Sequence, residues 1–485
     1  MTHEDHTFGL VKSLSMNEKR YFRVSATATG KDKNYLKVFD ALDKMKAYDP
    51  EKLRRTLKGI NLSYEKNYLQ KQLLKTLRGF YSDINSVTEL QGILHSLEIL
   101  YRRRLISQCQ KLVDKGIELC RRFEQWHYHL ELLDWQRRLY ARTGNYRVLT
   151  EYAKENLRQK QELLKTIHAF SIEQEKLIFV TSVLQQKSHY LSAPERKRFG
   201  QLRRSYRQNT RKHAAFRIAE IAYGAQYFIH HYLGDMQQAY AWNKAALELY
   251  DAHPQYIFDQ PFKYFVTCFN LVTRCIHFGK HEEALEHLKE IEKRLSGLSA
   301  FDRKEVSEEF YSGLIGWKAR IYFKMRQPAE ALKAAKEFER QVNFRQIRQN
   351  QRSHVDYSLA RIYFTSGMHR ESLKYVNKQI REGAKGLKLE YLLFAFLLRL
   401  CIYVEQDAQV LIMPTVSALE RFLNKNRVKD AFADEFTAFI KKYVGAGDDK
   451  AQRALVAKNF SKLKKLVSAN TEQYEVILRW LKTKM

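Results

Sequence analysis

The chain of 485 residues contains 19 glycines and 6 prolines, too few for the frequent tight turns that a β-rich chain of this length needs. Hydrophobic residues make up 45% and charged residues 29%, a balance that excludes a disordered chain. Lysine and arginine exceed aspartate and glutamate by 31, which favours polyanionic partners, although solvated basic helix faces would produce the same surplus.

Residues 1–85 are predicted to form an N-terminal region of short helices. Ser15 and Glu18 match a capping box in front of the segment KRYFRV. Asp49 followed by Pro50 marks another helix start, because proline suits the first turn of a helix. The first ten residues include acidic residues and histidines but no apolar core, so we expect no signal peptide.

Residues 86–425 combine helical spacing of apolar residues with a break that recurs at longer intervals. The breaks at 234, 279, 326 and 367 are separated by 45, 47 and 41 residues. A small residue follows five positions after each of these breaks, whereas the break at 144 is followed by a leucine. The breaks and the residues that follow them are Gly144 and Leu149, Gly234 and Ala239, Gly279 and Ala284, Arg326 and Ala331, and Gly367 and Ser372.

This pattern resembles the tetratricopeptide repeat, in which two antiparallel helices stack on the next pair. The resemblance places the small residue of the family's first helix on Ala319 and Ala360, and its aromatic residue on Tyr140, Tyr322 and Tyr363. It covers residues 125–380 well and 86–425 loosely. The units are longer than the roughly 34 residues of the family. The 90 residues from 144 to 234 would hold two units, so we expect a further repeat near residue 190.

Residues 426–485 are predicted to form three helices, at 430–444, 449–467 and 472–484. A stack of helix pairs needs a cap over the exposed face of its last repeat, and these helices suit that role. We therefore expect an all-α fold, an α-solenoid of antiparallel helix pairs in a tetratricopeptide-like superhelix. Its three regions would be the helical N-terminal region 1–85, the repeat array 86–425 and the C-terminal cap 426–485.

Catalytic and metal-binding patterns are missing from the sequence. It contains no phosphate-binding glycine loop, no nucleophile elbow and no H-E-x-x-H motif. Glu124 and His127 form one E-x-x-H pair, whereas a di-iron bundle needs two such pairs and two further glutamates. His281 and His287 miss by one residue the spacing that would place them on one helix face. We expect no enzyme, no cofactor and no metal site.

The repeat resemblance implies a first set of binding residues. In tetratricopeptide arrays certain positions of the first helix line a concave groove, and arginines at these positions would suit carboxylates or phosphates. Counting six residues back from each break gives Arg138, Phe228, Thr273, Arg320 and Arg361. Chance alignment in a chain rich in arginine is the alternative explanation.

A second candidate is the basic segment 195–213, in which only Glu195 is acidic. Phe199 and Tyr206 are interleaved with the cations, and such a mixture can contact phosphates and stack on bases. A helix with a basic outer face would give the same pattern. The cations are Arg196, Lys197, Arg198, Arg203, Arg204, Arg207, Arg211 and Lys212.

A third candidate is the stripe formed by Arg345, Arg348 and Arg352, which lie on one helical face among glutamines and asparagines that offer no countercharge. Solvent could neutralise such a stripe at little cost.

The leading functional hypothesis is a scaffold or adaptor that binds an acidic peptide or protein segment in a basic concave groove. The alternative is an RNA- or ribosome-associated factor that uses the basic segment and the arginine stripe on phosphates. An odd number of cysteines at helical spacings favours reduced thiols and a cytoplasmic setting. The most apolar run, 391–404, is interrupted by Arg399 and is shorter than the roughly 20 residues of a membrane span.

Overall fold

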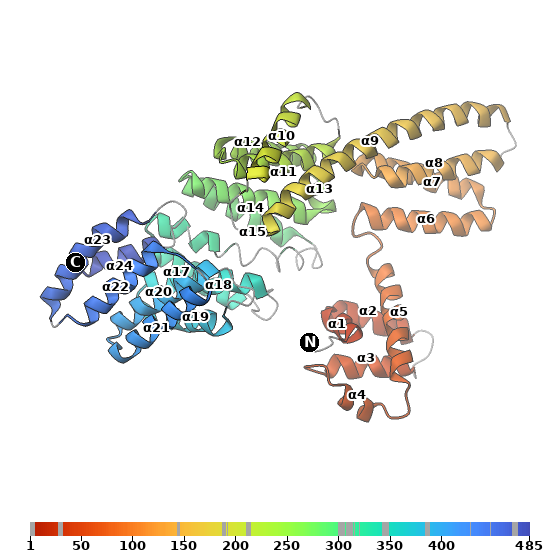
Figure 1. Ribbon diagram of the computed structural model, residues 1–485. Coiled ribbons are helices and arrows are strands. Elements are labelled where there is room, and N and C mark those ends of the chain that lie inside the picture. Colours follow the sequence, from red (N-terminus) through yellow and green to blue (C-terminus); the bar gives the residue numbers. More distant parts are fainter. Residues whose placement is uncertain are drawn as a thin grey trace. The chain divides into compact units, whose positions relative to one another are not determined.

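The computed structural model describes residues 5–27, 33–142, 146–186, 191, 193–209, 215–298, 306, 314, 316–319, 321–341, 349–383, 389–426, 428–446, 448–467 and 474–485. Helices follow one another through these ranges, and no strand occurs in them (Figure 1). The predicted all-α class is therefore confirmed. None of the helices in the described ranges has the length and apolar character required to cross a bilayer.

The chain divides into two compact units. The N-terminal unit comprises Met1–Ile178 and Lys212–Ile221, and the C-terminal unit comprises Phe179–Arg211 and Ala222–Met485. The division into 1–85, 86–425 and 426–485 remains a prediction. The first eleven helices are α1 His6–Ser13, α2 Met16–Thr27, α3 Asn34–Lys44, α4 Pro50–Thr56, α5 Leu62–Phe80, α6 Ser86–Arg102, α7 Ile106–Phe123, α8 Trp126–Arg142, α9 Tyr146–Gln186, α10 Ala193–Asn209 and α11 Phe216–Tyr232.

The remaining helices lie in the C-terminal unit. They are α12 Met236–Ala252, α13 Gln255–Asp259, α14 Pro261–His277, α15 His281–Gly297, α17 Pro328–Gln341, α18 Gln349–Thr365, α19 His369–Glu382, α20 Leu389–Glu405, α21 Gln409–Asn426, α22 Ala431–Val444, α23 Asp449–Lys465 and α24 Glu475–Thr483. Helical residues at 316–319 and 321–324 precede α17. The three helices predicted in 426–485 coincide closely with α22, α23 and α24.

Both helix starts predicted near the N-terminus are confirmed. The Ser15 N–H donates to the Glu18 carboxylate at 2.6 Å, and the Glu18 N–H donates to the Ser15 hydroxyl at 3.3 Å. Asp49 caps α4, with Pro50 in its first turn. Helices α1 to α5 then enclose a core of their own, in which Val11, Phe39 and other apolar side chains are fully buried.

Among the described residues, six turns between helices share one backbone geometry. In each, a residue with positive φ follows the helix, its N–H bonds to the carbonyl three residues back, and the next N–H bonds to the carbonyl five residues back. This Schellman-type pattern satisfies carbonyls that the end of a helix leaves free. The turn residues are Arg104, Gly234, Gly279, Arg326, Gly367 and Asp407.

Four of these six turn residues are the breaks found in the sequence. Sequence inspection missed Arg104 and Asp407, although Asp407 lies 40 residues beyond Gly367. Neither is a glycine, and neither is followed by an alanine five positions later, as Arg326 is. Successive helices joined by these turns, such as α6 and α7 or α18 and α19, pack against each other.

The residue five positions after each turn residue is buried, and it is small after five of the six turns, whereas Ile412 follows Asp407. Ala239, Ala284 and Ser372 are each 0% exposed and Ala331 is 3% exposed. The Ser372 hydroxyl donates at 2.8 Å to the carbonyl of Ala360, seven positions before its turn residue. The Cys109 thiol bears the same relation to the Leu97 carbonyl, at 4.0 Å. The small side chains let the paired helices approach closely, whereas α20 and α21 pack against each other with Ile412 at this position.

The region expected to hold a repeat near residue 190 differs from the prediction. Helix α9 runs without interruption from Tyr146 to Gln186, where a pair of helices would need a turn. The expected break falls at 187–190 and 192, outside the described residues. One helix of 41 residues therefore replaces the predicted helix pair.

Glu124, noted in the sequence for its spacing to His127, has a capping role. Its carboxylate accepts the backbone N–H groups of Phe216 and Arg217 at 2.8 Å each. It thereby caps the N-terminus of α11, where the helix dipole favours a negative charge. The Arg217 guanidinium lies over the rings of Trp126 and Phe170. These contacts give Glu124 a structural function and involve no metal.

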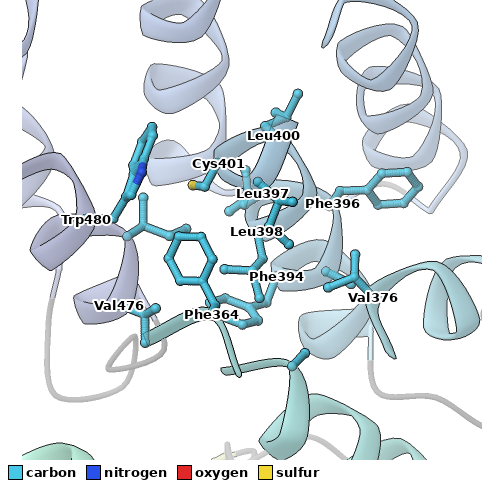
Figure 2. Close-up of a cluster of buried hydrophobic side chains, with 14 of the residues drawn as sticks. Phe364, Val376, Phe394, Phe396, Leu397, Leu398, Leu400, Cys401, Val476 and Trp480 are labelled. Atoms are coloured by element: carbon cyan, nitrogen blue, oxygen red, sulfur yellow. The ribbon is translucent and has the colours of Figure 1, made fainter. Parts of the chain in front are cut away.

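The last helices of the C-terminal unit share one core with α17 to α21. Helix α20 is buried on most sides, as its sequence predicts, with Leu397, Leu398 and Cys401 fully buried. Figure 2 shows that Phe364 of α18 reaches this core together with Val476 and Trp480 of α24. Residues 474–485 are thus built into the same core as the preceding helix pairs.

The turn geometry predicts opposite effects for two glycine-to-alanine changes. Gly279 has φ +71°, where a side chain costs about 1–2 kcal/mol, so Gly279→Ala should lower the free energy of unfolding by that amount. Gly224 lies inside α11 with open space around its Cβ position, so Gly224→Ala should raise the free energy by about 0.5–1 kcal/mol. Urea denaturation measures both. Equal effects of the two changes would contradict the role assigned to the turn.

Candidate functional site: an arginine cluster at the end of a helix

The five predicted groove positions are not shown to form one continuous row. Arg138 lies in the N-terminal unit, exposed and stacked on Trp135 at 5.0 Å. Phe228 and Thr273 are half-buried in the C-terminal unit, and the Thr273 hydroxyl donates to the Phe269 carbonyl of its own helix at 3.0 Å. Arg320 lies outside the described residues. A continuous basic row therefore remains a prediction, and Arg361 is the position whose surroundings are informative.

Arg361 is held on α18 between two aromatic rings. Its guanidinium lies 5.1 Å from the centre of the Phe323 ring and 5.2 Å from that of Tyr357. One nitrogen, Nη1, donates to the Tyr357 hydroxyl at 3.1 Å. The other, Nη2, is buried and has no acceptor. A buried guanidinium nitrogen without an acceptor is costly, so a small movement that lets an anion reach it would be favourable.

Arg479 of α24 lies over the same phenylalanine. Its guanidinium is 3.7 Å from the centre of the Phe323 ring, and its Nη1 donates to the Phe323 carbonyl at 2.9 Å. That carbonyl also accepts the N–H of Arg326 in the left-handed turn, at 3.2 Å. The nearest carboxylate, Glu475, is 3.9 Å from Arg479 and is bonded more closely to Lys324, at 3.0 Å.

The cations of this site act on one another. Burial lowers the pKa of the Arg479 guanidinium, and the charges of Arg326 and Arg361 lower it further, whereas Glu475 acts in the opposite direction. Neither Arg326 nor Arg361 has a carboxylate within ion-pair distance among the described residues. We call Phe323, Arg326, Tyr357, Arg361 and Arg479 the arginine cluster. It concentrates positive charge in partly desolvated surroundings, where a bound anion is worth more than at an open surface.

Four members of the arginine cluster were missed as binding residues in the sequence. Arg326 was recognised only as a break, and Phe323 and Tyr357 read as ordinary helix residues. Arg479 lies more than a hundred residues away, and its approach to Phe323 depends on the docking of α24. No spacing rule could have found it.

Most of the basic segment lies on α10. Arg196, Lys197, Arg198 and Arg204 are exposed, whereas Arg203 is half-buried with its Nε buried and without an acceptor. The side chain of Arg207, and residues Arg211 and Lys212, lie outside the described part.

The aromatic residues predicted to stack on bases do not lie at the surface. Phe199 is 0% and Tyr206 3% exposed, because they face the protein interior. Phe199 packs against Phe179 and Tyr232. The prediction of exposed stacking aromatics in this segment is therefore wrong, because these two side chains form the apolar face of the helix.

Only one of the three arginines of the predicted stripe lies among the residues that the structure describes. Arg345 and Arg348 lie outside the described residues, and Arg352 is half-buried on α18. Burial raises the pKa of the neighbouring Asp356 carboxyl, while its bond to Lys378 and the charge of Arg352 lower it. Arg352 therefore has an acidic neighbour, and the expectation of a stripe without countercharge is wrong at this position.

Two methionine substitutions test which arginines of the cluster stabilise the folded state. Arg361→Met keeps an unbranched side chain between the rings. It loses the bond to the half-buried Tyr357 hydroxyl but also removes a buried nitrogen without an acceptor, and these two changes oppose each other. The free energy of unfolding should therefore stay within about 0.5 kcal/mol of the parent value, or rise. Arg479→Met removes the bond to the Phe323 carbonyl and should cost about 1.5–3 kcal/mol. Urea denaturation compares them. A larger loss for Arg361→Met would make Arg361 a structural residue.

Comparison with known proteins identifies no family for this chain. No family model matches the chain, and a search of curated proteins finds no significant relative.

Proposed function

We propose that the chain is a tetratricopeptide-like α-solenoid that binds an acidic peptide or protein segment and catalyses no reaction. Support for the repeat comes from the shared turn geometry at Gly234, Gly279, Arg326 and Gly367 and from the buried small residue that follows each of them. A stack of helix pairs presents a long concave surface, which suits extended partners. The binding site on that surface would be the arginine cluster.

The observation that carries the proposal is that no carboxylate among the described residues pairs with Arg326 or Arg361. Two guanidinium groups without a carboxylate partner lie close enough to a third, that of Arg479, to lower its pKa. A ligand carboxylate would relieve this repulsion and supply the acceptor that Arg361 Nη2 lacks. Guanidinium and carboxylate groups form strong, often bidentate, hydrogen bonds.

The aromatic rings favour a carboxylate ligand over a nucleic acid. Phe323 is covered by the guanidinium groups of Arg361 and Arg479, and Tyr357 stacks on Tyr391 at 4.6 Å. These ring faces are occupied by side chains of the protein itself, so they offer little area for stacking on bases. Single-stranded nucleic acids depend on such stacking for much of their affinity.

Substitution at Arg361 tests the proposed ligand. Arg361→Ala should weaken binding of a fluorescent peptide rich in glutamate and aspartate by roughly tenfold to a hundredfold, the equivalent of losing one charged hydrogen-bonded contact worth about 1.5–3 kcal/mol. Arg381→Ala is the matched control, because Arg381 is an exposed arginine of α19 outside the cluster. Fluorescence anisotropy with the full chain measures both affinities. Equal weakening by the two variants would leave only nonspecific charge attraction and would refute the site.

RNA binding is the second candidate function, favoured by the four exposed cations of α10. Replacing Arg196, Lys197, Arg198 and Arg204 with alanine should weaken RNA binding alike for many sequences and reduce the dependence of affinity on salt, since each phosphate contact releases a counterion. Affinity for the acidic peptide should not change. If the parent protein does not associate with RNA at about 50 mM salt, where polyanion binding is favoured, this alternative is excluded.

A further inference from the structure

Three side chains of different metal-binding chemistry meet beside the Gly279 turn. Cys275 lies in the last turn of α14, and Glu283 and His287 lie on successive turns of α15. The Cys275 sulfur, a Glu283 carboxylate oxygen and a His287 ring nitrogen all lie within 4.8 Å of one another. The left-handed turn at Gly279 folds α15 back on α14 and so brings together residues from both helices.

The expectation of no metal in this region came from the spacing of His287 to His281. The structure pairs His287 instead with Glu283, at the i, i+4 spacing that places both on one helix face. The third group, Cys275, comes from the preceding helix, so no spacing within α15 could have indicated it.

This donor set suits zinc. Thiolate, imidazole and carboxylate are its usual ligands, at distances of about 2.0–2.3 Å, which correspond to donor separations of roughly 3–4 Å in a tetrahedral site. Glu283 and His287 can make the small rotations needed, because their side chains are 36% and 35% exposed. Cys275 is fully buried, and burial raises the pKa of its thiol to about 12, so Zn²⁺ would have to displace the thiol proton when it binds.

The groups around these three side chains are compatible with a bound cation. The Tyr240 hydroxyl donates to Glu283 at 2.8 Å and would orient the carboxylate. Lys280 pairs with the other carboxylate oxygen at 3.1 Å, but its side chain is 46% exposed and can move into solvent when a cation takes its place. An ion with three protein ligands would complete its coordination with water, as in open zinc sites.

We propose that Cys275, Glu283 and His287 bind one Zn²⁺ ion that ties α14 to α15 across the Gly279 turn. The site is independent of the arginine cluster and of the ligand proposed for it. Zinc binding to the folded chain would stabilise the helix pair, because the unfolded chain does not hold the three donors together.

Metal titration of the full chain tests this proposal. After chelator treatment, the parent protein should take up one equivalent of Zn²⁺ and melt at a higher temperature. With Co²⁺ as a probe, it should show the near-ultraviolet charge-transfer band of a thiolate–cobalt bond. Cys275→Ala should abolish that band, and His287→Gln, a change at a partly exposed residue, should weaken Zn²⁺ binding by more than roughly tenfold.

Two matched variants serve as controls. Cys268→Ala changes another buried thiol of α14, and His281→Gln changes another histidine of α15, and both should bind metal as the parent does. Absence of Zn²⁺ uptake by the parent would overturn the proposal. So would a cobalt–thiolate band that persists in Cys275→Ala or disappears in Cys268→Ala.

Discussion

The left-handed turn between consecutive helices is the constraint on which the rest of the structure depends. It ends one helix by satisfying two of its last carbonyls, and the next helix begins only a few residues later. At five of the six turns the facing residue of the second helix is small, which lets the two helices approach closely. Ser372 and Cys109, in different units, both place a small polar side chain against a backbone carbonyl of the partner helix. The buried alanines at 239, 284 and 331 occupy the same position.

The same turn also explains where the arginine cluster lies. Arg326 occupies a left-handed position that glycine fills at 234, 279 and 367, and a non-glycine residue there costs about 1–2 kcal/mol. A cation at the end of a helix is favoured by the helix dipole, which offsets part of that cost. Arg479 adds its charge because α24 docks onto the same helix end and donates to the Phe323 carbonyl. Backbone strain and unpaired charge thus coincide at one place, as they often do at functional sites.

The helices and most of the turns could be predicted from the sequence, because both depend on residues that are close together in the chain. Glycine at a break indicates a left-handed turn, and alanine five positions later indicates close packing of the next helix. The capping box at Ser15 and Glu18 is confirmed by both of its hydrogen bonds. Arg326 is not a glycine, and it was found because its spacing and Ala331 fit the repeat. Arg104 and Asp407 are followed at the fifth position by Cys109 and Ile412, so neither showed the pattern of a glycine with an alanine.

The candidate sites were less accessible to sequence reasoning, because they join residues that are distant in the chain or depend on the inward face of a helix. Arg361 was found through its position before a break, but its neighbours Phe323 and Arg479 meet it only through tertiary packing. Phe199 and Tyr206 looked suited to stack on bases, and the structure buries both. In the same way, Cys275 joins Glu283 and His287 only after α15 folds back on α14.

Site-specific photo-cross-linking in nuclease-treated native lysate tests the central claim most directly, because it identifies what touches the arginine cluster. A benzophenone amino acid at position 327, exposed beside Arg326 and outside the cluster, should cross-link to a protein through a peptide rich in aspartate and glutamate. The same probe at position 197, exposed on α10, should not capture that peptide. Capture of the same peptide from both positions, or no captured peptide of this composition at 327, would contradict the account.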